Sequence, residues 1–359
     1  MSIKLLTSPS SWIEGEALRQ LQVTSELPGM ISAIGLPDLH PGRGHPVGAV
    51  FLSKDIIYPY LIGSDIGCGM SLYATGMLAR KAKRDRWVKS LNIDGIWQDD
   101  QAKDELLAKH QAPDTYRNSI GTIGLGNHFA ELLTVEDVKN DTLDKKMLYL
   151  LVHSGSRGLG DEILRSHTEK FGAKGLAVSS GEAQAYLEKH DGAVKWAKAN
   201  REAIAIRLAE AIGLDITPIL DLCHNSVTCI DGCWCHRKGA TPHSGLAVVP
   251  GSRGSLSYLV AAKGNPADFG YSLPHGAGRK WNRSDAKARL KDRYLPTELV
   301  ITSLGSSVIC EDKDLLYEEA PEAYKNISSV IADMEEHKMA EVVGTFKPLI
   351  TYKMRNSEY

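Results

Sequence analysis

The chain has 359 residues, of which 43% are hydrophobic, and its formal net charge is −2. This size and composition predict a globular protein and exclude a disordered, collagen-like or repeat protein. The near-neutral total does not exclude a nucleic-acid partner, because basic residues gather locally at 80–84 and 279–293. A solvated helix surface is the plainer reading of the first of these clusters.

The first half of the chain is expected to combine short strands with helices. Glu14 and Glu16 are placed to favour the positive end of a helix near the N-terminus. The apolar run over 147–153 is typical of a buried strand that ends at His153. In chain order the predicted elements are a short N-terminal strand, a helix from about Ser11, strands at 47–52 and 56–58 within a β-like stretch over 31–72, a helical stretch over 79–112, a turn-rich stretch over 114–125 and a strand over 147–153.

The second half is expected to begin with the clearest helix of the chain, over about 191–212, which Gly213 would end. A later helix over 283–290 is predicted to be capped by Ser284, with Asp285 in its first turn. The remaining predicted elements are strands over 216–222, 245–249 and 256–261, a helical tail over 323–339 and a closing strand over 341–352.

No linker rich in Pro, Gly or Ser divides the chain, and glycine-rich turns occur from residue 35 to 278. A site built from these turns would draw on most of the chain. This favours one integrated α+β domain over residues 1–359, with its site at strand ends and in glycine-rich loops.

No apolar stretch approaches the length of a membrane helix, and the N-terminal residues lack the apolar core of a signal peptide. We therefore expect a cytoplasmic protein without membrane contact, whose six cysteines are reduced thiols. Cys229, Cys233 and Cys235 precede His236 at a spacing that is wrong for common structural zinc sites. We interpret 229–235 as a loop with incidental thiols.

Five histidines lie in short turns, and an acid and a thiol share another turn. Asp65 and Cys68 are three residues apart in a loop with three glycines, a pair that suits a divalent transition metal. With this pair, His128, His153 and His224 would suffice to hold two ions if the Cys68 sulfur bridges them. A buried structural cysteine and ordinary core or surface histidines are the alternative. The five histidines are His40, His128, His153, His224 and His275.

Two further turns combine small residues with an arginine. Backbone amides over 250–254 and 153–158 could form anion-binding nests, with Arg253 and Arg157 as planar phosphate ligands. An ordinary turn with a surface arginine is the alternative for each. His275 lies between Pro274 and Gly276, and a neutral imidazole is a competent nucleophile toward phosphorus. A metal ligand or a general base is the alternative for His275.

Taken together, six strings in order resemble the signatures of the RtcB family of RNA ligases. A seventh string, Glu-Ala-Pro-Glu-Ala-Tyr-Lys over 319–325, also resembles this family. The six strings are Asp-Ile-Gly-Cys-Gly-Met at 65–70, Gly-Thr-Ile-Gly-Leu-Gly-Asn-His-Phe at 121–129, His-Ser-Gly-Ser-Arg-Gly at 153–158, Arg-Lys-Gly-Ala-Thr at 237–241, Pro-Gly-Ser at 250–252 and His-Gly-Ala-Gly-Arg at 275–279.

The resemblance implies an α+β fold with mixed or antiparallel sheets. It implies GTP- and Mn²⁺-dependent joining of an RNA 3′-phosphate or 2′,3′-cyclic phosphate end to a 5′-hydroxyl end. His275 would take GMP covalently, and the RNA 3′-phosphate would then accept it to give an RNA(3′)pp(5′)G end. Asp65, Cys68 and His128 would hold one Mn²⁺, and Cys68, His153 and His224 would hold the second.

The resemblance also implies contacts to the nucleotide and to RNA. Arg157, Arg279 and Arg283 would face RNA phosphates. The expected guanylate contacts are Asn127, His128, Phe129, Ala130, Glu131, His224, Asn225, Pro250, Gly251, Ser252, Arg253, Ser257, His275, Gly276, Ala277, Gly278, Tyr324 and Lys353.

The chain departs from the family pattern in four ways. Arg253 stands where the family often has Met, and Lys353 is followed by Met354-Arg355-Asn356 rather than closing a Lys-Gly end. The chain is also shorter than typical members, and it has the unusual loop over Cys229–Cys235. These departures favour a divergent paralogue of the kind found beside a release-factor-like protein. We expect a monomer acting in tRNA splicing or RNA repair, including rRNA repair, with that protein or another activator as a partner.

Two other functions stay open at this point. One is a metal-dependent phosphodiesterase or phosphotransferase on the same scaffold. The other is a non-catalytic RNA-binding factor of a repair complex.

Overall fold

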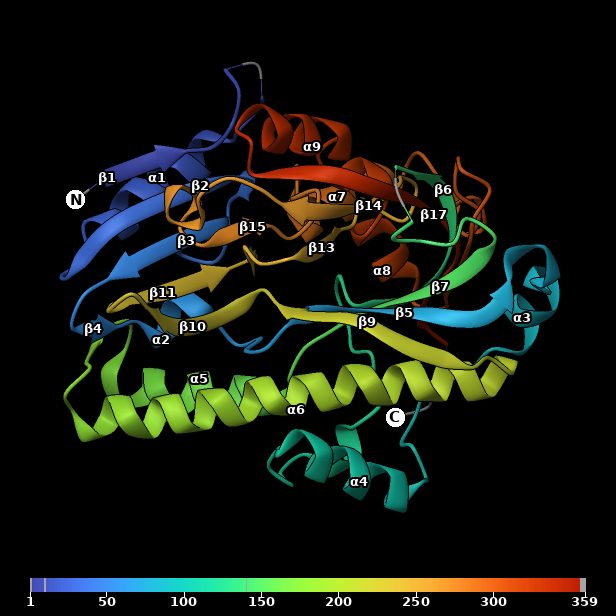
Figure 1. The fold of residues 1–359 in the computed structure, drawn as a ribbon, viewed down its shortest axis with the longest axis horizontal. Coiled ribbons are helices and arrows are strands. Elements are labelled where there is room, and N and C mark those ends of the chain that lie inside the picture. The colour runs from blue at the N-terminus through green and yellow to red at the C-terminus, as the bar shows by residue number, and fades with distance from the viewer. Residues whose placement is uncertain (1, 10, 140, 356–359) are drawn as a thin grey trace.

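The computed structural model describes residues 2–9, 11–139 and 141–355. Within them, two main sheets lie side by side and helices pack around them (Figure 1). Most strand pairs are antiparallel, and the parallel ones join β1 (Ser2–Leu5) to β2 (Met30–His40) and β16 (Ser307–Cys310) to β17 (Ala340–Met354). The predicted α+β class with mixed or antiparallel sheets is confirmed.

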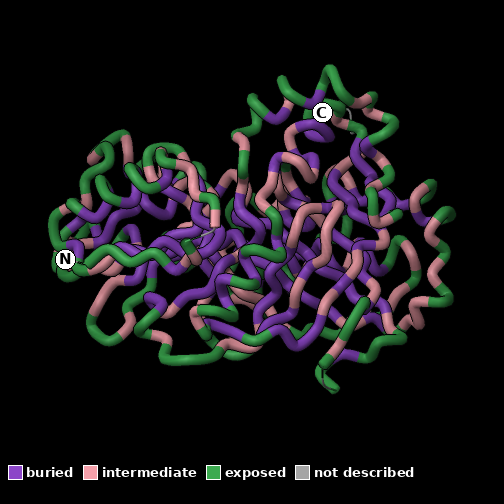
Figure 2. The backbone as a smooth tube through the Cα atoms, turned by 90° about the horizontal axis from the view of Figure 1, so that it is seen from above, coloured by how far each residue is buried: buried purple, intermediate pink, exposed green. Residues whose placement is uncertain are grey.

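The larger sheet has eight strands, and buried residues concentrate along the middle of the molecule (Figure 2). Its central strand β7 (Met147–Ser154) is buried along nearly its whole length, because its apolar side chains project from both faces of the sheet into packed regions. Seven of these strands follow one another in the order β13 (Leu246–Val249), β14 (Ser257–Ala262), β17, β6 (Phe129–Val138), β7, β5 (Gly69–Leu78) and β9 (Ile216–Cys223). The eighth strand, β16, lies off this path and pairs with β17.

The smaller main sheet has the order β1, β2, β3 (Val47–Ser53), β11 (Cys233–Lys238) and β10 (Asn225–Ile230). The chain leaves the larger sheet at the end of β9 and enters the smaller one at β10, with only His224 between them. Two short pairs complete the strands: β12 (Ala240–Pro242) with β15 (Ser272–Pro274), and β4 (Ile56–Ile57) with β8 (Leu176–Ala177).

Helix α6 (Gly181–Ile212) runs along the lower side of the molecule in Figure 1 and packs against β5, β7 and β9. The Ser180 hydroxyl caps its start by accepting from the Ala183 amide, and Gly213 ends it with a φ of 71°. Its alanine-rich buried face lets the helix approach the sheet closely. That face includes Ala193, Trp196, Ala199, Ala203, Ile204 and Leu208.

The other helices are shorter. Helix α9 (Ile327–Glu336) contacts both β2 and β17 and so joins the two main sheets on the side away from α6 (Figure 1). The remainder are α1 (Gly15–Ser25), α2 (Pro59–Ile62), α3 (Arg84–Ser90), α4 (Asp100–His110), α5 (Gly158–Phe171), α7 (Arg283–Leu290) and α8 (Lys313–Glu318).

Most predicted strands are confirmed, because they are apolar runs that end at glycine, proline or polar turns. They are the N-terminal strand and those over 47–52, 56–58, 147–153, 216–222, 245–249, 256–261 and 341–352, which correspond to β1, β3, β4, β7, β9, β13, β14 and β17.

Several helix boundaries were predicted wrongly. The first helix begins at Gly15 rather than near Ser11, and α6 begins at Gly181, ten residues before 191, directly after its Ser180 cap. The stretch over 79–112 is not one helix but a short 3-10 turn, α3 and α4, because 91–99 is irregular. The predicted helical tail from 323 starts at Ile327, after a 3-10 turn that Pro321 begins.

The cap of α7 is also corrected. The Asn282 side chain, not that of Ser284, accepts from the Asp285 amide at 2.8 Å. The Ser284 hydroxyl donates to the same Asn282 oxygen at 2.7 Å. Asn and Ser are equally favoured as N-cap residues, so residue type alone could not decide between Asn282 and Ser284.

The interpretation of 229–235 as a loop is wrong, because β10 and β11 form a hairpin across it. Ile230 pairs with Cys233, so the turn holds only Asp231 and Gly232, whose φ values are 51° and 76°. Asp-Gly with two positive φ values is the favoured two-residue hairpin turn. Strand β6 and helix α5, which follow glycine-rich motifs, were not predicted at all.

Candidate active site

Four strands of the larger sheet bring the predicted metal ligands to one edge. Cys68 precedes β5 and His128 precedes β6, whereas His153 is the second-last residue of β7 and His224 follows β9. These strands are neighbours in the order β6–β7–β5–β9 and run antiparallel, so starts and ends alternate along the same edge. The register confirms the alignment, because His153 lies opposite both Met70 and Phe129.

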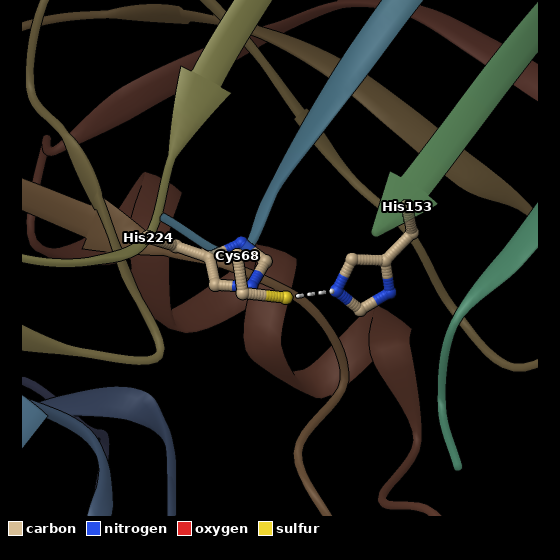
Figure 3. A group of neighbouring side chains, drawn as sticks. All are labelled: Cys68, His153 and His224. Carbon is tan, nitrogen blue, oxygen red and sulfur yellow. Dashed lines mark hydrogen bonds between the residues drawn. The ribbon is translucent and has the colours of Figure 1, made fainter. Parts of the chain in front are cut away.

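The ligand atoms form two groups that share the Cys68 sulfur. Asp65, Cys68 and His128 make one group, and Cys68, His153 and His224 make the other, with ligand atoms in each group within 4.8 Å of one another. The Cys68 Sγ lies 3.2 Å from Nε2 of His153 and 3.3 Å from Nε2 of His128. Figure 3 shows the Cys68 sulfur directed at His153, with the His224 ring beside it.

Outer contacts orient two of these imidazoles. The Nδ1 of His128 lies 3.1 Å from the Ile123 carbonyl oxygen, and that of His153 lies 3.1 Å from the Asn127 carbonyl oxygen. Each Nδ1–H therefore donates to a carbonyl and leaves Nε2 with its lone pair toward the sulfur. The Nδ1 of His224 is buried without a hydrogen-bond partner among the described residues, which is typical of an atom that awaits a ligand.

The electrostatics suit cation binding. Burial raises the pKa of Asp65, but His128 and the other neighbours lower it more, so the net pKa lies well below its usual range. Burial, followed by the effect of other histidines, lowers the pKa values of His153 and His224, which favours neutral imidazoles. Burial and Asp65 raise the pKa of the Cys68 thiol. A divalent cation would reverse that last shift, because coordination deprotonates a thiol.

Two residues of α6, which the sequence did not single out, hold the ligand loops in place. Arg201 donates to the Gly67 and Ser154 carbonyl oxygens at 2.8 and 2.9 Å, and its buried guanidinium forms an ion pair at 2.7 Å with the partly buried Asp221. Asn200 accepts from the Gly121 amide at 2.8 Å and donates to the Ser154 hydroxyl at 3.1 Å.

Close packing explains one glycine of these loops. A Cβ on Gly155 would lie 1.9 Å from Oδ1 of Asp65, so a larger residue would displace the carboxylate of this ligand candidate.

His275 lies next to the ligand cluster and is oriented by an acid. Its Nδ1 is 2.6 Å from Oδ2 of Asp38, which also accepts from the His275 amide at 3.2 Å. Asp38 is fully buried, and the rings of His275 and His224 are 4.8 Å apart. Because Asp38 accepts from Nδ1, the lone pair of Nε2 is available as a nucleophile.

His40 supports this pair. Its Nδ1 lies 2.8 Å from the Asp38 carbonyl oxygen, and burial lowers its pKa to about 4. The imidazole is therefore neutral near pH 7 and adds no charge beside Asp38. This places the previously unassigned histidine of the Asp-Leu-His-Pro-Gly turn behind the nucleophile candidate.

The metal-ligand candidates, His275 and His40 all line one cavity of about 1590 Å³. Its wall includes nearly every predicted site residue: Asp65, Cys68, Asn127, His128, Phe129, Glu131, His153, Arg157, His224, Asn225, Pro250, Gly251, Ser252, Arg253, His275, Gly276, Ala277, Gly278, Arg279, Arg283, Tyr324 and Lys353. Ala130 and Ser257 are buried and are not among the lining residues, and their nucleotide contacts stay predictions.

Part of the cavity wall carries buried acids beside buried cations. Burial raises the pKa of Glu131 to about 7, and the Thr351 hydroxyl donates to its carboxylate at 2.5 Å. Burial lowers the pKa of Lys353. Arg253 donates from Nη2 to the Leu316 carbonyl oxygen at 2.8 Å, while its buried Nε and Nη1 have no acceptor among the described residues. This wall can offer both donors and acceptors to a base.

The three arginines predicted for RNA lie on the wall in different settings. Arg279 and Arg283 contact Glu319 at 3.0 and 3.2 Å, and Tyr324 also donates to this buried carboxylate. Arg157 donates to the Thr122 hydroxyl at 3.2 Å.

Sequence reasoning missed Asp38, Arg201, Asn200 and Glu319. The Asp-x-His spacing in the turn at 38–40 was the one available signal for Asp38. Of the other three, Asn200 and Arg201 lie within the long helix, and Glu319 begins the family-like string over 319–325 but was given no role there.

No helix in the described part of the chain is both long enough and apolar enough to cross a membrane.

The family model described as tRNA-splicing ligase RtcB matches residues 20–98 and 94–354. The chain is 44% identical to RNA-splicing ligase RtcB2 of Escherichia coli, over 97% of this chain and 94% of that protein. It is 27% identical to the tRNA-splicing ligase RtcB of Nanoarchaeum equitans, over 95% and 92% of the two chains. The chain therefore belongs to the RtcB family and is an RNA ligase.

Proposed function

We propose that this RNA ligase joins an RNA 3′-phosphate end to a 5′-hydroxyl end with GTP. The observation that carries the proposal is the Asp38–His275 pair, which lies against the ligand cluster that shares Cys68. An oriented nucleophile beside a group of metal ligands is what nucleotidyl transfer requires.

In the first step, Nε2 of His275 attacks the α-phosphorus of GTP, a nitrogen–phosphorus bond forms and pyrophosphate leaves. Asp38 holds the proton on Nδ1 and stabilises the charge that the ring gains. In the second step, an oxygen of the RNA 3′-phosphate attacks the same phosphorus and His275 leaves. In the third, the 5′-hydroxyl attacks the activated 3′-phosphate and GMP leaves. A 2′,3′-cyclic phosphate end would first be opened by water.

We infer that the metal is Mn²⁺ and that two ions bind. Asp65, Cys68 and His128 would hold one, and Cys68, His153 and His224 the other, since mixed carboxylate, imidazole and thiolate ligands suit a divalent transition metal. When bound, such ions would neutralise phosphate charge and polarise the attacked phosphorus. The unpartnered Nδ1 of His224 supports this fit.

The cavity wall supports guanylate binding by the predicted residues that line it. Glu131 can accept from a base N–H, and Lys353 and Arg253 can donate to its carbonyl oxygen and ring nitrogen. Arg157, Arg279 and Arg283 would contact RNA phosphates.

Because the cavity draws on residues from Glu14 to Lys353, we propose that the whole chain acts as one domain. We also propose that the protein is a cytoplasmic monomer that acts in tRNA splicing or RNA repair. Its partner would be a release-factor-like or activating protein.

Labelled GTP tests the proposal directly. Incubation with α-labelled GTP and Mn²⁺ should give an acid-labile protein adduct that is absent in His275→Ala. A phosphodiesterase on the same scaffold would cleave RNA ends without this adduct, and a non-catalytic factor would bind RNA but do neither. Either result would contradict the proposal.

A further inference from the structure

A basic surface begins at the wall of the active-site cavity and continues over α7. Arg283 and Lys287, on α7, line the cavity, together with the cap residue Asn282. The segment 279–293 contains seven Lys or Arg residues but only two acidic ones. The cavity and this helix therefore share one positively charged rim.

The cations of this segment fall into two sets. Three are paired with carboxylates: Arg279 and Arg283 with Glu319, and Lys287 with Asp314. The other four are exposed and form no ion pair with any described residue. These four are Lys280, Arg289, Lys291 and Arg293. Unpaired exposed cations remain available to a polyanion.

An aromatic ring lies among the unpaired cations. The Trp281 indole is partly exposed, with the Lys280 ammonium 5.3 Å and the Arg289 guanidinium 4.9 Å from its ring centroid. Its inner side packs against the apolar cluster that includes Leu290 and Leu315, which anchors the ring. Binding sites for single-stranded nucleic acid combine such rings, on which bases stack, with cations that contact the backbone.

We propose that the α7 surface, defined by Lys280, Trp281, Arg289, Lys291 and Arg293, binds the single-stranded RNA next to the end held in the cavity. A base stacks on Trp281 when Lys280 and Arg289, which lie over the ring in the free protein, turn outward to contact phosphates with Lys291 and Arg293. The inference rests on the proposed ligase function and deepens it. RNA whose end lies in the cavity must leave across the rim, and α7 is a basic part of that rim.

The test compares strands of two lengths. Strands of about 3 and about 20 nucleotides, ending in a 3′-phosphate or a 5′-hydroxyl, are titrated at several salt concentrations. Lys280→Gln/Arg289→Gln should bind at least one of the two long strands roughly tenfold more weakly than the wild type does. The slope of log affinity against log salt concentration should be smaller by about 2 for that strand. The short strands should bind as they do to the wild type.

Matched variants separate the surface from general effects. Arg80→Gln/Lys83→Gln removes the same charge from exposed residues outside the cavity lining and should leave both long strands unaffected. Trp281→Phe keeps a stacking ring and should bind more tightly than Trp281→Leu, whereas pure packing would affect both equally. Equal loss in these two variants would contradict the stacking role.

GTP labelling of His275, measured in parallel, distinguishes the two proposals. Absence of labelling in the wild type would sink the proposed function. Normal labelling with unchanged affinity of the α7 variants for both long strands would overturn the inference and favour an acidic protein as the partner of this surface.

Discussion

Asp38 and His275 are 237 residues apart in the chain, yet the carboxylate of one accepts from the ring of the other at 2.6 Å. Asp38 reaches this position from the end of β2 in the smaller main sheet, while the metal-ligand candidates come from the edge of the larger sheet. The reactive group therefore lies where the two sheets meet, and it depends on both.

Asp38→Asn should abolish most GMP transfer to His275. An amide can present its N–H to Nδ1 and so place the proton on Nε2, where the lone pair is needed; such a change in a comparable acid–histidine pair costs about 10⁴ in rate. The single-turnover rate of adduct formation with labelled GTP should therefore be at least roughly 100-fold lower in Asp38→Asn than in the wild type. Metal content should stay the same, and a rate within a few-fold of the wild type would exclude the orienting role.

Cys68→Ala should affect both metal sites, whereas Asp65→Asn should affect one. Among the residues that the structure describes, only Cys68 belongs to both ligand groups. Elemental analysis after dialysis against Mn²⁺ should therefore show a larger loss of bound metal in Cys68→Ala. Equal losses in the two variants would contradict the bridging thiolate. Cys235→Ala, which removes a buried thiol outside the cavity lining, is the control.

Arg201→Met should destabilise the fold, since it leaves the mostly buried carboxylate of Asp221 with the Ser71 hydroxyl but without its charged partner. Breaking one side of a buried ion pair costs about 3–5 kcal/mol in the free energy of unfolding. The double variant Arg201→Met/Asp221→Leu should recover part of that loss, as measured by denaturant unfolding. Because Arg201 also holds the Gly67 and Ser154 carbonyl groups, the double variant should still bind metal poorly.

Ionisation of Glu131 should lower the free energy of unfolding of the metal-free, nucleotide-free protein as the pH rises from about 4.5 to about 7. Burial raises the pKa of Glu131 to about 7 in the folded state, so the folded protein holds this proton longer than the unfolded chain. Stability from this group is full below the unfolded pKa and is lost as the pH rises through the folded pKa. The difference is on the order of 3 kcal/mol.

Glu131→Gln removes that titration and is the comparison. The wild type should lose stability relative to Glu131→Gln between pH 4.5 and 7.5 in denaturant unfolding. Parallel profiles for the two proteins would show that Glu131 ionises normally.

Arg253→Met should stabilise the nucleotide-free protein but weaken GTP binding. The buried Nε and Nη1 have no acceptor among the described residues, and each unsatisfied buried donor costs about 1–3 kcal/mol. If a bound nucleotide supplies the acceptors, the variant should have a higher Tm alone, a smaller shift with GTP and a Kd raised about tenfold. An unchanged Kd would remove Arg253 from the nucleotide site.

The sequence by itself determined the chemistry of the site. Asp65, Cys68, His128, His153 and His224 are each recognisable in their own short motif, because a ligand's type and its tight turn are local properties. The strands β7 and β17 were equally readable, since an apolar run reports burial without reference to a partner.

Tertiary structure alone decided which groups meet. Whether Asp38 touches His275, or Arg201 of α6 reaches Gly67, depends on strand order, register and helix placement, which arise from packing between residues far apart in the chain. The lining of the cavity by Glu319 and the exposure of Trp281 beside it are of the same kind. Local patterns record which side chains are present and which face is apolar, but the distances between them come from the assembled sheets.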